Sequence, residues 1–293
     1  RAPKENGTYS RKNALRFAGS RSIFGQSACG VGADGMKQDA QISSDDARLR
    51  AALKGIDRPL LMERSVKAVT NGLITGRYLV SFPRAALGPG PSRKLRGILE
   101  NLEAPPDEIA ALDSFQASSQ SVHFGFEPDP KGTWYKCYLE FSLRDRPHPG
   151  LTFIALKWAA DGRCATTLYH DRDALNHDQQ SQLVLDILPD SSVRDTFLAL
   201  MAASSGSGSL RFLEVTEPGN PRRSVDLNLA DKGVKVADYH SALLDLLGRD
   251  PAAEAYLQHC KADSLGHVAA GTNREGKAFG TLYHGAHRVS GDL

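Results

Sequence analysis

Residues 151–170 read LTFIALKWAADGRCATTLYH, and residues 265–284 read LGHVAAGTNREGKAFGTLYH. The two segments align without a gap at a constant offset of 114 residues, and seven of the twenty positions are identical. Each has a central glycine-containing turn, Asp161-Gly162 in the first and Glu275-Gly276 in the second. The pattern predicts two antiparallel hairpins that form an internal repeat. Shared strand-and-turn chemistry without common ancestry is the alternative interpretation.

On either side of these two segments, the chain alternates between predicted hairpins and predicted helix pairs. Further hairpins are predicted at 63–82, 122–142 and 210–229, although the first could also be a helix leading into one strand at 78–82. Helices are predicted at about 93–103, 106–117, 177–187, 190–204, 236–248 and 251–262, and a short one is capped by Ser44 and stopped by Pro59.

This order of elements predicts an α+β chain of eight to ten antiparallel strands, in which hairpins alternate with helix pairs and are internally repeated. A repeated sheet that hides its edges closes or nearly closes on itself, so we expect a closed or half-open barrel with helices outside. The predicted domains are an arm at 1–40 and a single repeat-built α+β domain at 41–293. No helix pair is predicted between Ser142 and Leu151.

The arm is basic and rich in glycine and serine, and no apolar period is sustained along it. It is either a targeting segment or an extension upstream of a native start near Met36. Residues 25–32, GQSACGVG, weakly resemble a phosphate-binding loop but lack its Lys-Ser/Thr ending.

The composition excludes several classes of protein. The 293 residues carry 36 Lys and Arg against 34 Asp and Glu, a net charge of +2, which does not fit a nucleic-acid binder. No apolar run approaches the 18 residues of a membrane span. The four cysteines are scattered, which argues against a disulfide framework and indicates a reducing, cytoplasmic setting.

Alternation along the strands divides polar from apolar faces. At 134–141, Trp134, Lys136, Tyr138 and Glu140 share one face, opposite a face of Tyr135, Cys137, Leu139 and Phe141. The apolar face suits packing against helices. The polar face either meets solvent on an open sheet or lines a barrel lumen that holds a ligand.

The residue types on these polar faces suggest a chemistry. Cations on strands could bind a phosphate or diphosphate, and aromatic rings beside them could stabilise a carbocation. Carboxylates could orient an acceptor or take its proton. The candidate catalytic residues are Glu140, Tyr138, Tyr169 and Tyr283, and the candidate substrate-binding residues are Arg77, Trp134, Lys136, Lys157 and Asp226.

Other reaction classes have weaker support. His170 and His284 occupy equivalent positions of the repeat, so a pseudo-symmetric metal pair is conceivable, but no metal-ligand spacing occurs in the sequence. There is no nucleophile elbow and no nucleotide-binding fingerprint after a strand. We therefore predict no metal and no cofactor.

Hairpins alternating with helix pairs over residues 60–290 resemble, in element order, the ABBA-type aromatic prenyltransferases. The resemblance implies a ten-stranded barrel with an active site in its lumen, where a prenyl group passes from an allylic diphosphate to an aromatic acceptor. Small aromatic and prenyl-type ligands would be its partners. The alternative is a non-catalytic ligand-binding or maturation protein that holds a pigment, cofactor or peptide for a partner enzyme, which the basic arm could contact.

Overall fold

The structure is a computed structural model that describes residues 33–56, 59–129, 131–189, 191–204 and 211–289. Side chains are described from residue 41 onward. Residues 1–32 of the predicted arm, and the Gly/Ser-rich stretch at 205–209, lie outside the described residues.

Ten antiparallel strands form a closed barrel in which each strand pairs with its neighbours in sequence and the first pairs with the last. The predicted α+β barrel is therefore confirmed in its closed form, and the segment at 63–82 is a hairpin throughout. The strands are β1 (Leu60–Val69), β2 (Gly72–Pro83), β3 (Ser119–Glu127), β4 (Trp134–Phe141), β5 (Leu151–Ala159), β6 (Cys164–Asp171), β7 (Arg211–Glu217), β8 (Asn220–Asn228), β9 (Leu265–Thr272) and β10 (Ala278–Val289).

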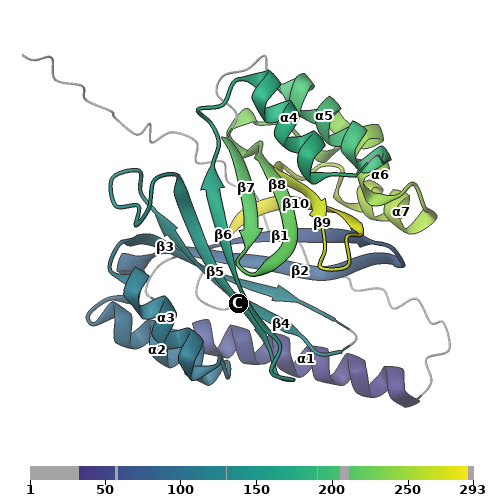
Figure 1. Cartoon of the computed structure of the whole chain (residues 1–293). Helices are drawn as coiled ribbons and strands as arrows, with labels where there is room; N and C mark the ends of the chain where they lie inside the picture. The colour runs from purple at the N-terminus through teal and green to yellow at the C-terminus, as the bar shows by residue number, and fades with distance from the viewer. Residues whose placement is uncertain (1–32, 57–58, 130, 190, 205–210, 290–293) are drawn as a thin grey trace, which may run out of the picture.

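The helices pack in two groups against the outer surface of the barrel (Figure 1). The first group is α1 (Ala33–Leu53), α2 (Pro91–Asn101) and α3 (Pro106–Gln116), and the second is α4 (His177–Ile187), α5 (Ser192–Ser204), α6 (His240–Leu247) and α7 (Pro251–Cys260). None of the helices in the described ranges is long and apolar enough to cross a bilayer.

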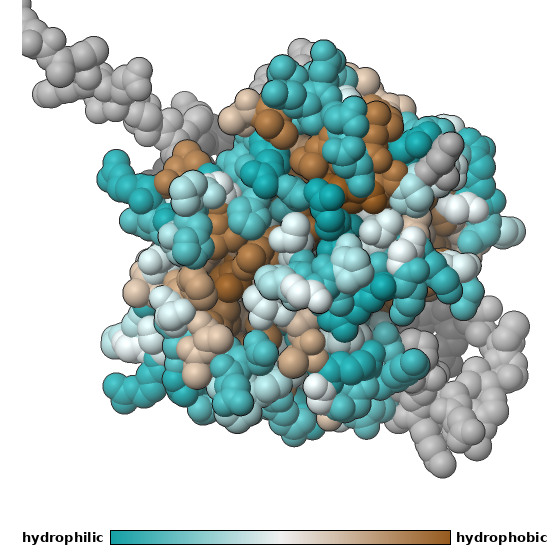
Figure 2. Space-filling view, in the orientation of Figure 1, coloured by the Kyte–Doolittle hydropathy of each residue, from teal (hydrophilic) through white to brown (hydrophobic). Residues whose placement is uncertain are grey.

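The outward strand faces supply the core, as the alternation predicts. Cys137 and Leu139 of β4 are fully buried in a cluster with Leu95 and Leu99 of α2. In the other half, Leu227 of β8 packs in a second cluster with helices α4–α7. Figure 2 shows mainly hydrophilic side chains on the visible face, with apolar groups gathered beside the upper helices and along the left side.

The two hairpins of the repeat, β5–β6 and β9–β10, have the same strand register. Ala155 pairs with Thr167 in β5–β6, and the equivalent Ala269 pairs with Thr281 in β9–β10. Both ladders also shift register at the same place, just before the histidine that ends the repeated segment. Both hairpins are thus confirmed, and their common ancestry stays a prediction.

Helix α1 differs from its prediction. It begins at Ala33, so Ser44 lies inside the helix and does not cap it. Asp46 accepts a hydrogen bond from the Tyr78 hydroxyl at 2.5 Å, and the Tyr135 hydroxyl donates to the Asp45 carbonyl at 3.0 Å. The side chain of Asp46 therefore binds the barrel and does not serve a local cap.

Candidate active site

The barrel encloses a cavity of about 720 Å³. Every candidate site residue from the sequence lines it, so the polar strand faces point into a lumen. These residues are Arg77, Trp134, Lys136, Tyr138, Glu140, Lys157, Tyr169, Asp226 and Tyr283.

The lumen has two chemically different ends. The five hairpin turns, at 70–71, 128–133, 160–163, 218–219 and 273–277, meet at one end, which we call the hairpin end. The longer connections that carry the helix pairs leave from the other, which we call the helix end; the connection at 142–150 lies there without helices.

A four-residue cluster of charges lies near the hairpin end, and its centre is Glu127, the last residue of β3. Oε2 of Glu127 accepts hydrogen bonds from Nε of Arg77 at 3.1 Å and from Nζ of Lys136, and Oε1 lies 3.7 Å from Nζ of Lys67. Burial alone would raise the pKa of Glu127, but the three cations hold it well below its usual range. The carboxylate is therefore ionised.

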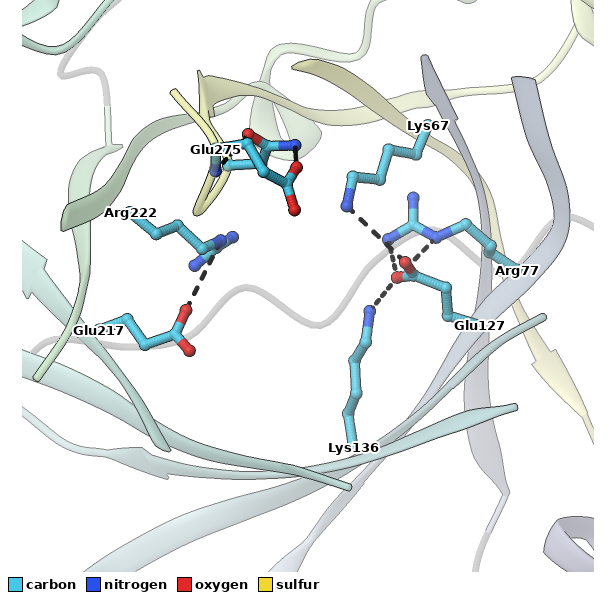
Figure 3. Close-up of polar contacts among 8 residues, drawn as sticks. Lys67, Arg77, Glu127, Lys136, Glu217, Arg222 and Glu275 are labelled. Carbon is cyan, nitrogen blue, oxygen red and sulfur yellow. Dashed lines mark hydrogen bonds and ion pairs between the residues drawn. The ribbon is translucent and has the colours of Figure 1, made fainter. Parts of the chain in front are cut away.

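A second cluster faces the first across the lumen (Figure 3). Arg222 of β8 lies 3.9 Å from Glu217 of β7, and Arg274 also binds Glu217. The ring of Phe279 lies between the clusters, with Lys67 4.9 Å and Arg222 5.5 Å from its centroid.

Two lysines of the lumen sit side by side with like charge. Lys136 and Lys157 are direct cross-strand partners in β4 and β5, an arrangement that is unfavourable in a sheet. Burial and the neighbouring cations lower the pKa of Lys136 to about 8 and that of Lys157 well below its ordinary value. Gly125, opposite Lys136, leaves room for the lysine chain, because a Cβ there would lie 3.3 Å from it.

The hydrogen-bond donors of the cations at the hairpin end are not all satisfied. Nη1 of Arg77 and Nη1 of Arg222 are buried without a hydrogen-bond partner among the described residues. No ion pair joins Lys157 to a carboxylate within that part of the chain. Buried donors normally have partners, so this end of the lumen could accept an anion.

An aromatic wall adjoins the cations. The ring of Tyr169 lies 5.8 Å from that of Tyr138 and 5.7 Å from that of Phe153, both in tilted or edge-on contact. Burial raises the pKa of both tyrosines, so their hydroxyls stay protonated. Neutral, electron-rich ring faces beside an anion site could stabilise a cation that forms there.

The helix end contains a histidine with a hydroxyl and a carboxylate on its two sides. Nδ1 of His123 lies 2.7 Å from the Ser81 hydroxyl, and Nε2 lies 3.2 Å from Oε2 of Glu140. Burial would raise the pKa of Glu140, but its hydrogen bond with His123 and the nearby Arg211 lower it. We therefore assign the Nε2 proton to the bond with Glu140, which leaves Nδ1 facing Ser81.

The second histidine of this end is held as a cation. Nδ1 of His267 lies 2.8 Å from Oδ2 of Asp226, and Nε2 lies 3.4 Å from Glu63. Burial opposes the charge, but these two carboxylates raise the pKa of His267 well above its usual value. The imidazolium stacks on Tyr283 at a centroid separation of 3.8 Å and an angle of 8°.

Some of these residues were missed by sequence reasoning. Glu127 ends β3 and points into the lumen, and the outward alternation of Phe124 and Phe126 would have indicated this. His123 of β3 and His267 of β9 also line the lumen. Lys67, Phe153 and Arg222 follow the same period-two alternation and could have been found by it.

The two histidines at equivalent positions of the repeat do not meet in one place. His284 is buried outside the lumen, where Nδ1 lies 2.8 Å from Asp263 and Nε2 2.9 Å from the Tyr256 hydroxyl. His170 is half-buried, near Arg172 and Glu214. Among the described residues, no group of three or more His, Cys, Asp or Glu side chains is arranged to hold a metal ion.

Solved structures share this architecture. The 5-dimethylallyltryptophan synthase from Streptomyces coelicolor superposes with a TM-score of 0.55 at 15% identity, covering 87% of this chain and 91% of that chain. The chain has the fold of the ABBA-type aromatic prenyltransferases.

Two further prenyltransferase barrels support the likeness. PriB, solved with L-tryptophan and dimethylallyl thiolodiphosphate, gives a TM-score of 0.56 at 14% identity, with 76% of this chain and 79% of that chain covered. AnaPT from Neosartorya fischeri gives 0.53 at 13% identity, with 79% of each chain covered. No family model matches the sequence, and no curated protein matches it. At these identities the likeness is one of fold.

Proposed function

We propose that the protein transfers a prenyl group from an allylic diphosphate to an electron-rich aromatic acceptor inside the barrel. The observation that carries the proposal is the excess of cations at the hairpin end, with buried guanidinium nitrogens of Arg77 and Arg222 that lack a partner among the described residues. PriB, a protein of the same fold, is solved with an aromatic amino acid and a prenyl diphosphate analogue together.

The cations would hold the leaving group. Arg77, Lys136, Lys157 and Arg222 converge on one space from four strands, so they could bind the diphosphate oxygens together. When the allylic carbon–oxygen bond breaks, its electron pair leaves with the diphosphate, and the cations stabilise the charge that develops there.

The aromatic wall would shield the allylic cation from water. Tyr138, Tyr169 and Phe153 present neutral rings beside the anion site. Tyr283 is less suited than the sequence suggests, because the His267 cation covers one ring face and the Arg77 guanidinium lies 5.8 Å from its centroid. We therefore assign it to holding His267 and Arg77 in place.

The helix end would hold the acceptor. A bond forms between the allylic carbon and the acceptor, and the acceptor then loses a proton, which the Glu140 carboxylate could take. Glu140 is ionised and bonds to one ring nitrogen of His123, while Ser81 bonds to the other. The carboxylate could therefore orient an N–H or O–H of the acceptor. Trp134 lies at the other end, under the Arg163 guanidinium at 4.6 Å, and Asp226 is engaged by His267.

The test is calorimetry with inorganic diphosphate, followed by mass spectrometry after incubation with dimethylallyl diphosphate and a panel of indoles and phenols. We expect binding by the unmodified protein and a prenylated acceptor. The double variant Lys136→Ala/Lys157→Ala should lose about a hundredfold or more in affinity, because charge-assisted hydrogen bonds are removed. The matched control is Lys54→Ala/Lys94→Ala, two exposed lysines outside the barrel.

The outcomes separate the two interpretations of the sequence. Absence of diphosphate binding by the unmodified protein would contradict the transferase proposal. Binding of an aromatic ligand without turnover of any donor would favour the non-catalytic binding protein.

A further inference from the structure

Glu127 stands out in the lumen because it places a negative charge inside a site built for an anion. It is 7% exposed and lies among cations from β1, β2 and β4. At the hairpin end the cations outnumber the carboxylates, so a buried carboxylate there reduces the capacity of this site to bind an anion.

The geometry of this carboxylate resembles that of a bound phosphate oxygen. A single oxygen, Oε2, accepts hydrogen bonds from Nε of Arg77 at 3.1 Å and from Nζ of Lys136, and Nη2 of Arg77 also lies 3.1 Å from it. Several strong donors converging on one oxygen is the arrangement that phosphate recognition needs. The same two side chains would be the first to contact a diphosphate in this space.

We propose that the Glu127 carboxylate is an internal competitor of the diphosphate, which binds by displacing it from Arg77 and Lys136. This inference rests on the proposed function, since it requires a diphosphate at this site. Lys67, 3.7 Å from the other carboxylate oxygen, lies near the hairpin end and can keep the displaced carboxylate paired. Charge therefore remains balanced in both states.

The competition has a consequence for turnover. Cations from four strands would hold the released diphosphate tightly, and product release limits the rate of many enzymes. When the carboxylate returns to Arg77 and Lys136, it replaces the contacts that the diphosphate gives up. Glu127 thereby sets both the donor affinity and the rate at which the product leaves.

The test compares Glu127→Gln, Glu127→Asp and unmodified protein in calorimetry and stopped-flow dissociation with inorganic diphosphate at pH 6, where the lysines carry more of their charge. We expect Glu127→Gln to bind at least about tenfold more tightly and to release diphosphate more slowly, because a nearby negative charge is gone. Glu127→Asp keeps the charge and should stay within about threefold of the unmodified protein.

The matched control is Glu214→Gln. Glu214 is also a buried carboxylate held by two arginines, Arg172 and Arg223, but it does not line the cavity. Its replacement should leave diphosphate affinity unchanged. Weaker or unchanged binding by Glu127→Gln, relative to this control, would overturn the proposal.

A second measurement does not depend on the variants folding. In a crystal structure of the unmodified protein with inorganic diphosphate, Arg77 and Lys136 should contact phosphate oxygens and Glu127 should have left them. Retention of both Glu127 contacts would overturn the inference while leaving the proposed function intact. If the unmodified protein fails to bind diphosphate, the proposed function itself fails.

Discussion

The hairpins β5–β6 and β9–β10 share a register and the ending Thr-Leu-Tyr-His, yet they give the lumen opposite chemistry. Where the first has Phe153, which packs edge-on against its tyrosine, the second has the His267 cation stacked flat on Tyr283. Where the first has Lys157, the second has Gly271.

In these two hairpins the backbone register is the same while the side chains that face the lumen differ, so fold and site chemistry are set by different positions. The repeated Ala155 and Ala269 have equivalent cross-strand partners, Thr167 and Thr281, and the tyrosine of each hairpin places a ring on the lumen. Two lumen positions per hairpin then decide the local charge. In the first hairpin Lys157 adds a cation to the hairpin end, and in the second His267 provides an imidazolium between two carboxylates.

The largest expected effect on stability is at Gly271, which stands where the first hairpin has Lys157. A Cβ at Gly271 would lie 2.3 Å from the Ser224 Cβ and 2.4 Å from the Arg223 carbonyl oxygen, so the backbone would have to move. We expect Gly271→Ala to lower the free energy of unfolding by at least about 3 kcal/mol in urea titration. The control Gly97→Ala, in open space on α2, should raise it by about 1 kcal/mol. Equal effects at both glycines would contradict the close packing of β8 and β9.

The next largest effect on stability is expected at His267, which stands where the first hairpin has Phe153. His267→Gln leaves two partly buried carboxylates without their cation, so we expect a loss of about 2 kcal/mol at pH 6. The folded pKa of His267 lies above its unfolded value, so its contribution is complete below about pH 6.5 and disappears as pH rises through the folded pKa.

The control for that contrast is Phe153→Leu, which should cost about 1 kcal/mol at every pH because no charge is involved. Unfolding titrations of both variants between pH 6 and 10 check the difference. A pH-independent loss for His267→Gln would show that its role is packing.

The smallest expected effect is a gain in stability at Lys157. Burial and neighbouring cations lower its folded pKa below the unfolded value of about 10.4, so charging it opposes folding. Lys157→Met should therefore raise the free energy of unfolding by about 1 kcal/mol at pH 7, and the gain should vanish above pH 11. Thermal unfolding at both pH values, with exposed Lys54→Met as the control, measures it. A loss at pH 7 would mean that Lys157 has a carboxylate partner.

Much of the fold was predictable because it depends on local patterns. Turn residues such as Asn71-Gly72 and Asp161-Gly162 mark the hairpins, and period-two alternation placed Lys136 and Tyr138 on one face of β4. Helix α1 was misjudged because its stability depends on contacts such as Tyr78 with Asp46, which join residues 32 positions apart. Such contacts leave no local signal.

The sequence by itself determined the strand and helix order and which side chains share a strand face, because both follow from the chain's short-range periodicity. Only the tertiary structure decided that the polar faces turn inward, because pairing of β1 with β10 joins residues more than 200 positions apart. Closure brings Arg77, Glu127 and Arg222 from distant strands into one low-dielectric lumen. Their charges interact strongly only there.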